Sequence, residues 1–186
     1  ASSAVSAVPE VAFTLQEAMG TSAFWLIASA SAMFFMVVGA VNLHQLPHML
    51  DVGVPPALAV GAVSVISLFA AVGTVTWGLL VDRVGPRLCL TINFGIAAIS
   101  MVMLLIMQNT IMAYAYAVVY GFSLGGGSPL LGVAWASYFG RGALARIRGA
   151  TTLSNQVFNA IGPAIAGLLF DLTSSYLIPF LLFVFA

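Results

Sequence analysis

Residues 78–87 read GLLVDRVGPR, a short charged turn between two long apolar runs. Residues 57–81 lead into this turn, and residues 88–107 lead out of it. A helix crosses a bilayer with roughly 20 apolar residues, so each run is long enough to be a membrane span. Charges are costly inside the hydrocarbon layer, which places the turn in water or among lipid head groups. Gly85 permits a tight turn, and Pro86 suits the first turn of a new helix.

The composition predicts an integral membrane protein. Hydrophobic residues make up 62% of the chain and charged residues only 5%. A soluble domain carries about 25% charged residues, so this chain lacks the side chains for a water-exposed surface. Its net charge is zero, which gives no indication of a nucleic-acid partner. The single cysteine, Cys89, excludes an intrachain disulfide, and the sequence shows no cluster of metal ligands, so we expect neither a metal nor a cofactor.

The apolar runs predict an all-α six-span bundle. Backbone groups in lipid must be satisfied within their own segment, which leaves helices for runs of this length. Thr14 and Glu17 have the spacing of a helix capping box, which predicts a short surface helix after a linker tail within residues 1–20. The last span is too short to cross, and we expect a fragment cut at both ends. The expected spans are residues 22–46, 57–81, 88–107, 111–139, 150–170 and an incomplete 176–186.

The arginines predict the orientation. All five lie in two turns, one after the second span and one after the fourth. These turns fall on one side if each run crosses once, and the positive-inside rule makes that side cytoplasmic. The amino end is then cytoplasmic too, and the turn with His48 and Asp51 faces outward. We expect a multi-pass protein of the plasma (inner) membrane.

The turn resembles the loop signature of the major facilitator superfamily of secondary transporters, G-x-x-x-D-R-x-G-R-R. The match comprises Gly78, Asp82, Arg83, Gly85 and Arg87, and Pro86 replaces the first of the paired basic residues. Four further stretches resemble the monocarboxylate and oxalate–formate porter branch: TLQEAMGTSAFW at 14–25, LHQLPHMLDVGVPPALA at 43–59, YFGR at 138–141 and IGPAIAGLLFDLTSSY at 161–176.

The resemblance implies a twelve-helix transporter of which this chain holds helices seven to twelve. The missing amino-terminal half is then a partner, together with membrane lipid and a small-molecule substrate. Such a half consists of two three-span repeats of inverted orientation. The branch often carries a substrate-binding arginine in its eighth helix, but the corresponding span here has only Ser64, Ser67, Thr74 and Thr76 as ordinary polar residues. None of the expected spans contains Asp, Glu, Lys or Arg.

Three groups of residues are candidates for function. The signature residues Gly78, Asp82, Arg83, Gly85 and Arg87 are either interfacial charges or a cytoplasmic gate, and the glycine spacing favours the gate. A hinge is predicted where glycine and proline interrupt helices, at Gly126, Gly127, Pro129, Gly162 and Pro163, whereas close packing is the first interpretation for Gly121. Polar residues within the spans either line a substrate cavity or bond helices together: Asn42, His44, Gln45, Ser64, Asn155, Gln156 and Asn159.

The function expected from these features is secondary transport of a small solute, such as an organic anion of the monocarboxylate class, by alternating access. One alternative is a membrane-embedded enzyme, for which Ser128 and His44 are the only serine–histidine pair worth naming, without an acyl-enzyme signature around them. Another alternative is a non-transporting receptor on the same fold. The substrate, the coupling ion and the direction of transport are not encoded in any motif of this sequence.

Overall fold

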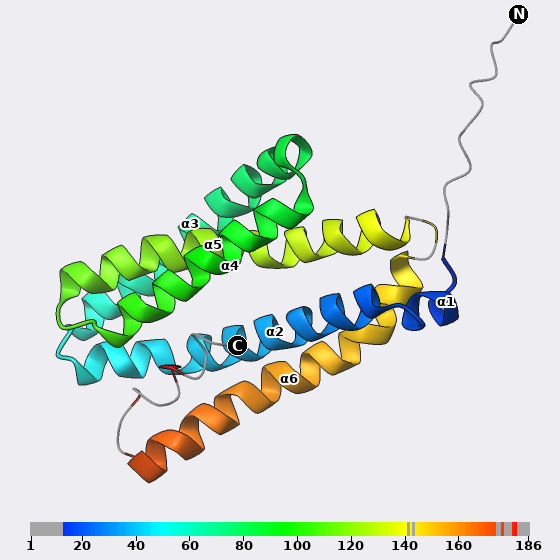
Figure 1. The fold of residues 1–186 in the computed structure, drawn as a ribbon. Coiled ribbons are helices and arrows are strands. Elements are labelled where there is room, and N and C mark those ends of the chain that lie inside the picture. Colours follow the sequence, from blue (N-terminus) through cyan, green and yellow to red (C-terminus); the bar gives the residue numbers. More distant parts are fainter. Residues whose placement is uncertain (1–12, 141, 143, 174–175, 177–179, 182–186) are drawn as a thin grey trace, which may run out of the picture.

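The computed structural model describes residues 13–140, 142, 144–173, 176 and 180–181. In this part of the chain every regular element is a helix, which confirms the predicted all-α class (Figure 1). The expected tail at 1–12, Arg141 and most of the incomplete last span lie outside the described residues. The helices are α1 Leu15–Met19, α2 Ser22–Asp51, α3 Pro56–Val84, α4 Pro86–Leu105, α5 Thr110–Phe139 and α6 Leu144–Thr173.

The predicted capping box starts α1. The Glu17 backbone N–H donates to Thr14 Oγ1 at 3.3 Å, and the Thr14 N–H donates back to Glu17 Oε2 at 2.8 Å. Hydrogen bonds from the Thr14 backbone and hydroxyl stabilise the carboxylate and lower the pKa of Glu17 below its ordinary value. Two donors that the first helical turn leaves unpaired are thereby satisfied, which fixes α1 beside the start of α2.

The charged turn separates α3 from α4 with a single residue. Gly85 has φ of 91°, a left-handed backbone angle that favours glycine, and Pro86 occupies the first position of α4. The N–H that Pro86 lacks would have no partner there, so the proline costs the helix nothing. The two spans therefore meet at a sharp corner, as the sequence predicts.

Successive long helices run in opposite directions (Figure 1). The α3–α4 and α5–α6 connections lie at the end of the molecule where α2 begins, and the α2–α3 and α4–α5 connections lie at the other end. We call the first of these the arginine end, because it holds Arg83, Arg87, Arg146 and Arg148. The turn after Asp51 is at the opposite end.

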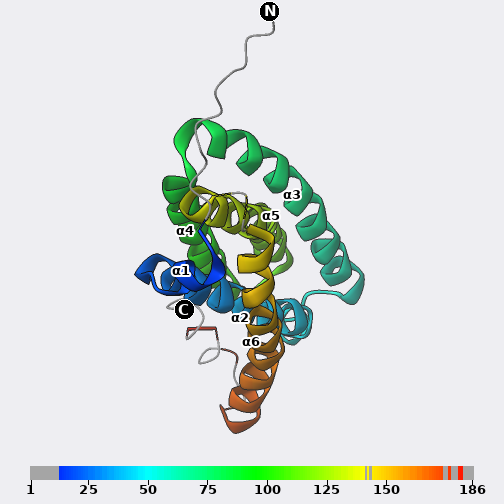
Figure 2. The same ribbon diagram turned by 90° about the vertical axis from the view of Figure 1, so that its right-hand side faces the viewer.

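Two helix pairs form the main contacts: α3 packs on α5, and α2 packs on α6 (Figure 2). Both contacts are made by glycines that bring backbones together. A Cβ on Gly121 would lie 2.5 Å from the Ile66 carbonyl oxygen, and one on Gly162 would meet the Met36 carbonyl oxygen. If the first and second three spans are matched in order, α2 corresponds to α5 and α3 to α6, so each pair is the counterpart of the other. Two inverted repeats require such a relation, in which the second helix of each repeat packs on the first helix of the other.

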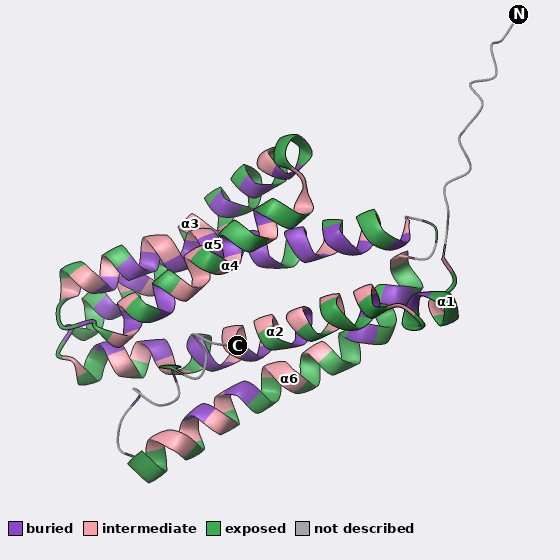
Figure 3. Ribbon diagram, in the orientation of Figure 1, coloured by how far each residue is buried: buried purple, intermediate pink, exposed green. Residues whose placement is uncertain are grey.

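All five long helices carry exposed residues (Figure 3), and many of these residues are large and apolar. Side chains such as Leu26, Val75 and Leu153 are more than half exposed, at 70%, 64% and 74%. The five long helices, α2 to α6, are long and apolar enough to cross a membrane. A surface of this kind is stable in lipid or against other apolar helices rather than in water.

Two helices, α2 and α6, extend five or more residues beyond one end of their expected spans. The helix α2 continues through Pro47 to Asp51, although a loop was expected after residue 46. Proline removes one backbone bond, and the surrounding turns retain the helix here. The helix α6 starts at Leu144 instead of residue 150 and so contains Arg146 and Arg148. The helix therefore carries two arginines before the expected fifth span, residues 150–170, which itself contains no charged residue.

Candidate functional site

The signature turn lies on the surface at the arginine end. Asp82 and Arg83 are exposed in the last turn of α3. Arg87 is held within the chain: its Nε donates to the Tyr138 hydroxyl at 2.7 Å, and its guanidinium carbon lies 5.2 Å from the centre of that ring. The turn is thereby tied to the end of α5. Its role as a gate against another set of helices stays a prediction.

Asn42 and Gln45 join α2 to α5. The Tyr116 hydroxyl donates to Gln45 Oε1 at 2.8 Å, and the Tyr120 hydroxyl donates to Asn42 Oδ1 at 3.2 Å. The two tyrosine rings are stacked, with centroids 5.3 Å apart. Gln45 is only 3% exposed. These contacts favour bonding between helices, because the amide groups already have partners.

His44 and Ser64 are also engaged locally. His44 Nε2 lies 3.1 Å from the Pro163 carbonyl oxygen, which links α2 to α6. The exposed Ser64 hydroxyl donates to the Val60 carbonyl oxygen at 3.2 Å within its own helix. The structure therefore favours a hydrogen-bonding role for His44 and gives Ser64 no solute-facing pocket among those described.

The three amides of α6 divide into two roles. Asn159 Nδ2 donates to the Phe35 carbonyl oxygen at 3.0 Å and bonds α6 to α2. Asn155 and Gln156 instead line a pocket between α2, α5 and α6. The Asn155 Oδ1 atom is buried without a hydrogen-bond partner among the described residues. Asn159 therefore bonds two helices together, and a substrate cavity stays a prediction for Asn155 and Gln156.

We call this space the α2–α5–α6 pocket. It has a volume of about 110 Å³, room for roughly three or four waters at about 30 Å³ each. Hydroxyl, amide and guanidinium groups make up much of its wall, and its described lining includes one cation and no acidic side chain. The lining residues are Ser31, Phe35, Ser128, Leu131, Gly132, Trp135, Arg148, Thr151, Thr152, Asn155 and Gln156.

The cation of the pocket is the Arg148 guanidinium, which lies beside Gly132 of α5. A Cβ on Gly132 would lie 3.4 Å from Arg148 Nη1, so the guanidinium rests against the bare backbone of α5. Thr151 and Thr152 donate to the Arg148 carbonyl oxygen at 3.0 and 2.8 Å. Their hydroxyl protons are therefore used within α6, whereas the exposed Ser128 hydroxyl faces the pocket from α5.

Sequence reasoning missed Arg148 as a site residue because it was assigned to a turn. A helical period traced back from Asn159 would have found it: Asn155, Thr152 and Arg148 follow at steps of four, three and four residues. Residues at these steps share one helix face. Arg148 thus lies at the end of a polar stripe that runs along α6.

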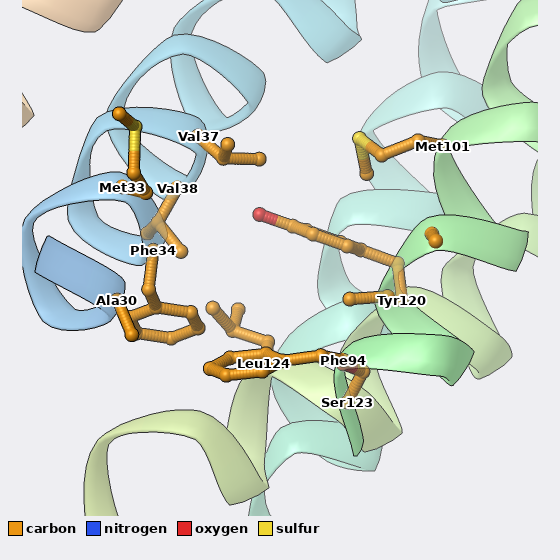
Figure 4. Close-up of a pocket in the computed structure, with 12 residues that line it drawn as sticks. Ala30, Met33, Phe34, Val37, Val38, Phe94, Met101, Tyr120, Ser123 and Leu124 are labelled. Carbon is orange, nitrogen blue, oxygen red and sulfur yellow. The ribbon is translucent and has the colours of Figure 1, made fainter. Parts of the chain in front are cut away.

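A second, larger cavity of about 250 Å³ lies between α2, α4 and α5 (Figure 4). Its wall is apolar and includes Met33, Phe34, Val37 and Met101. The Tyr120 side chain projects its hydroxyl from α5 toward α2 (Figure 4). With so few polar groups, this cavity offers no means of holding a charged solute.

The hinge residues are packed in continuous helices. Pro129 lies within α5 and Pro163 within α6. The carbonyl that Pro129 leaves without its usual donor, that of Gly125, accepts a bond from Thr74 Oγ1 at 2.9 Å. A Cβ on Gly126 would meet the Trp77 ring. The freed carbonyl is thus satisfied by α3 instead of facing solute.

Close packing applies equally to the remaining hinge positions. A Cβ on Gly127 would meet the Phe34 ring. Pro163 leaves the Asn159 carbonyl oxygen without its usual donor within α6, and this oxygen packs against Gly39 of α2, where a Cβ would meet it. The hinge itself stays a prediction.

The serine–histidine pair is not assembled, because Ser128 lines the α2–α5–α6 pocket whereas His44 bonds to Pro163.

The fold and its apolar surface define a multi-pass α-helical membrane protein. The family model of the Major Facilitator Superfamily matches residues 23–186. The chain belongs to the major facilitator superfamily, as its signature turn indicates.

Several curated relatives confirm the resemblance to the monocarboxylate branch. The chain is 26% identical over 167 residues to monocarboxylate transporter 12-B of Danio rerio, which covers 88% of this chain and 34% of the relative. It is 26% identical to monocarboxylate transporter 12 of Homo sapiens, over 84% of this chain and 31% of the relative. It is 24% identical to the uncharacterized MFS-type transporter YcxA of Bacillus subtilis (strain 168), over 89% of this chain and 44% of the relative. The chain therefore spans less than half the length of these relatives.

Proposed function

We propose that this chain is the carboxyl-terminal half of a secondary transporter that moves a small organic anion, such as a monocarboxylate, by alternating access. The observation that carries the proposal is the α2–α5–α6 pocket, whose described lining combines one arginine with hydroxyl and amide groups. A guanidinium stays charged at all physiological pH values and forms paired hydrogen bonds with carboxylates. The relatives named monocarboxylate transporters support the same class of solute.

The exposed apolar faces of α3 and α6 support the alternating-access part of the proposal. Leu68 and Leu79 of α3 are 61% and 66% exposed, and Leu153 and Leu172 of α6 are 74% and 73% exposed. We assign these faces to a contact with the amino-terminal six helices. The two halves then rock about a site between them, as inverted-repeat transporters do.

The arginine end is assigned to the cytoplasm, on the positive-inside rule. Asp82 and Arg83 are exposed there, beside the corner at Gly85. We propose that they form a gate with the amino-terminal half when the transporter opens outward. In this arrangement, the start of α2 is cytoplasmic, and the protein lies in the plasma (inner) membrane.

The proposal is tested by uptake in proteoliposomes that contain the full-length protein. Radiolabelled lactate, pyruvate and succinate are compared with an uncharged solute of similar size, such as glycerol. We expect uptake of at least one monocarboxylate above the level of protein-free liposomes and no uptake of glycerol. Uptake of glycerol alone, or of none of these solutes by properly inserted protein, would contradict the proposal.

A further inference from the structure

Arg148 lies within a helix rather than beyond its end. It is the fifth residue of α6, about 6 Å along the axis from Leu144 at about 1.5 Å per residue. The pocket that it lines reaches Gln156, two turns further into α6. Arg148 is exposed in the structure, so its guanidinium is free to pair with an anion that enters the pocket.

No acidic side chain of the described residues provides this anion. Glu17 is engaged with Thr14 in the capping box. Asp51 and Asp171 lie near the carboxyl ends of α2 and α6, at the end of the molecule opposite the arginine end. Asp171 is about 35 Å along the axis of α6 from Arg148. Asp82 belongs to the end of α3, which does not line the pocket.

A second group in the pocket also lacks a partner. The buried Oδ1 of Asn155 accepts no hydrogen bond in the described part of the chain. A buried acceptor without a donor costs about 1–3 kcal/mol, so the site is more stable when a polar molecule occupies it. The cation and the free acceptor together match a small solute that has a carboxylate and a hydroxyl group.

We propose that Arg148 binds the carboxylate of the transported solute in the α2–α5–α6 pocket. This inference rests on the proposed function and adds the residue that recognises the anion. The guanidinium lies beside Gly132 of α5, where a Cβ would be in ordinary contact with Nη1 at 3.4 Å.

The test uses the full-length protein in proteoliposomes with radiolabelled lactate, which carries both a carboxylate and a hydroxyl donor. Arg148→Gln removes the charge from the pocket. Arg146→Gln is the matched control, because Arg146 is exposed in the same helical turn and does not line the pocket. We expect Arg148→Gln to raise the KM for lactate about tenfold or more, the size expected for a lost charge-assisted hydrogen bond, and Arg146→Gln to leave it within about twofold.

A second variant separates solute binding from folding. Arg148→Cys is reconstituted first and then treated with a methanethiosulfonate reagent that adds either an ammonium group or a neutral methyl group. The wild-type protein is treated in parallel to correct for its other cysteines. Because the reagent acts on protein already folded and inserted, recovery of lactate uptake with the ammonium reagent alone would show that the pocket needs the positive charge.

The outcomes distinguish this inference from the proposed function. If the wild-type protein moves lactate and both glutamine variants have the same KM, Arg148 does not bind the solute, although the transport function stands. Failure of the ammonium group to restore uptake by inserted Arg148→Cys, when the wild type is active, also overturns the inference. If the wild-type protein moves no carboxylate, both proposals fail.

Discussion

Gly125→Ala is the sharpest test of how α3 and α5 are packed. A Cβ at this position would meet the Ala70 carbonyl oxygen and lie 2.8 Å from both the Ala70 carbonyl carbon and the Thr74 backbone nitrogen. Ordinary contacts begin at 3.4 Å, so the two 2.8 Å contacts alone require α3 to move by about 0.6 Å, and the closer carbonyl oxygen requires a larger movement. Overpacking of this kind costs about 1–3 kcal/mol, against a gain of about 1 kcal/mol from the better helix propensity of alanine.

Gly95→Ala is the matched control, because a Cβ at Gly95 in α4 meets no atom within 4 Å. It has the propensity gain without the clash, so the difference between the two variants isolates the overpacking cost. The assay is denaturant unfolding of the full-length protein in detergent micelles, followed by tryptophan fluorescence. We expect Gly125→Ala to be less stable than Gly95→Ala by about 1–3 kcal/mol. Equal stability of the two variants would refute the close contact of α3 with α5.

Three further predictions follow from individual contacts. Tyr116→Phe leaves buried Gln45 without its hydroxyl donor, so we expect the free energy of unfolding to fall by about 1–3 kcal/mol in the same assay. An unchanged free energy of unfolding would contradict this hydrogen bond. In the full-length protein, Asp82→Asn should weaken the proposed gate by about 1.5–3 kcal/mol, which cysteine labelling at the arginine end would report as about tenfold greater access. The lowered pKa of Glu17 stabilises α1 above the pKa of the unfolded chain, and this contribution is lost as the pH falls through the folded pKa, below 4.5. Protection of the α1 amides against hydrogen exchange, taken relative to the intrinsic exchange rate at each pH, should therefore fall at low pH in the wild-type protein and not in Glu17→Gln.

The sequence predicted the features that depend on local chemistry. The spans follow from apolar length, the capping box from the Thr14–Glu17 spacing, and the corner between α3 and α4 from Gly85 followed by Pro86. Each of these is decided by a few neighbouring residues and by the requirement that backbone groups in lipid be paired. They therefore appear in the structure as expected.

Helix ends near polar residues were harder to predict. The sequence places Arg146 and Arg148 in a turn, because charges are expected outside the membrane, yet α6 includes both. Arginine is a good helix former, and its long side chain lets the charged group lie away from the backbone position. A helix that extends beyond the hydrocarbon layer therefore carries these residues without a break.

The roles of individual amides could not be predicted, because they depend on the opposite helix. Asn155 and Asn159 share a face of α6, yet Asn159 bonds to the Phe35 carbonyl of α2 and Asn155 faces the pocket. Similarly, the partner of Gln45 is Tyr116, a residue 71 positions away in the sequence.

Counterflow of lactate is the measurement that tests the account most directly. Proteoliposomes with the full-length protein are loaded with unlabelled lactate and diluted into buffer containing a trace of labelled lactate. A carrier that alternates between two sides exchanges the solutes, so we predict transient accumulation of label above its equilibrium level, about tenfold less at subsaturating lactate in Arg148→Gln than in Arg146→Gln. Label that only equilibrates, or that never enters beyond the level of protein-free liposomes, would contradict transport of an organic anion by alternating access.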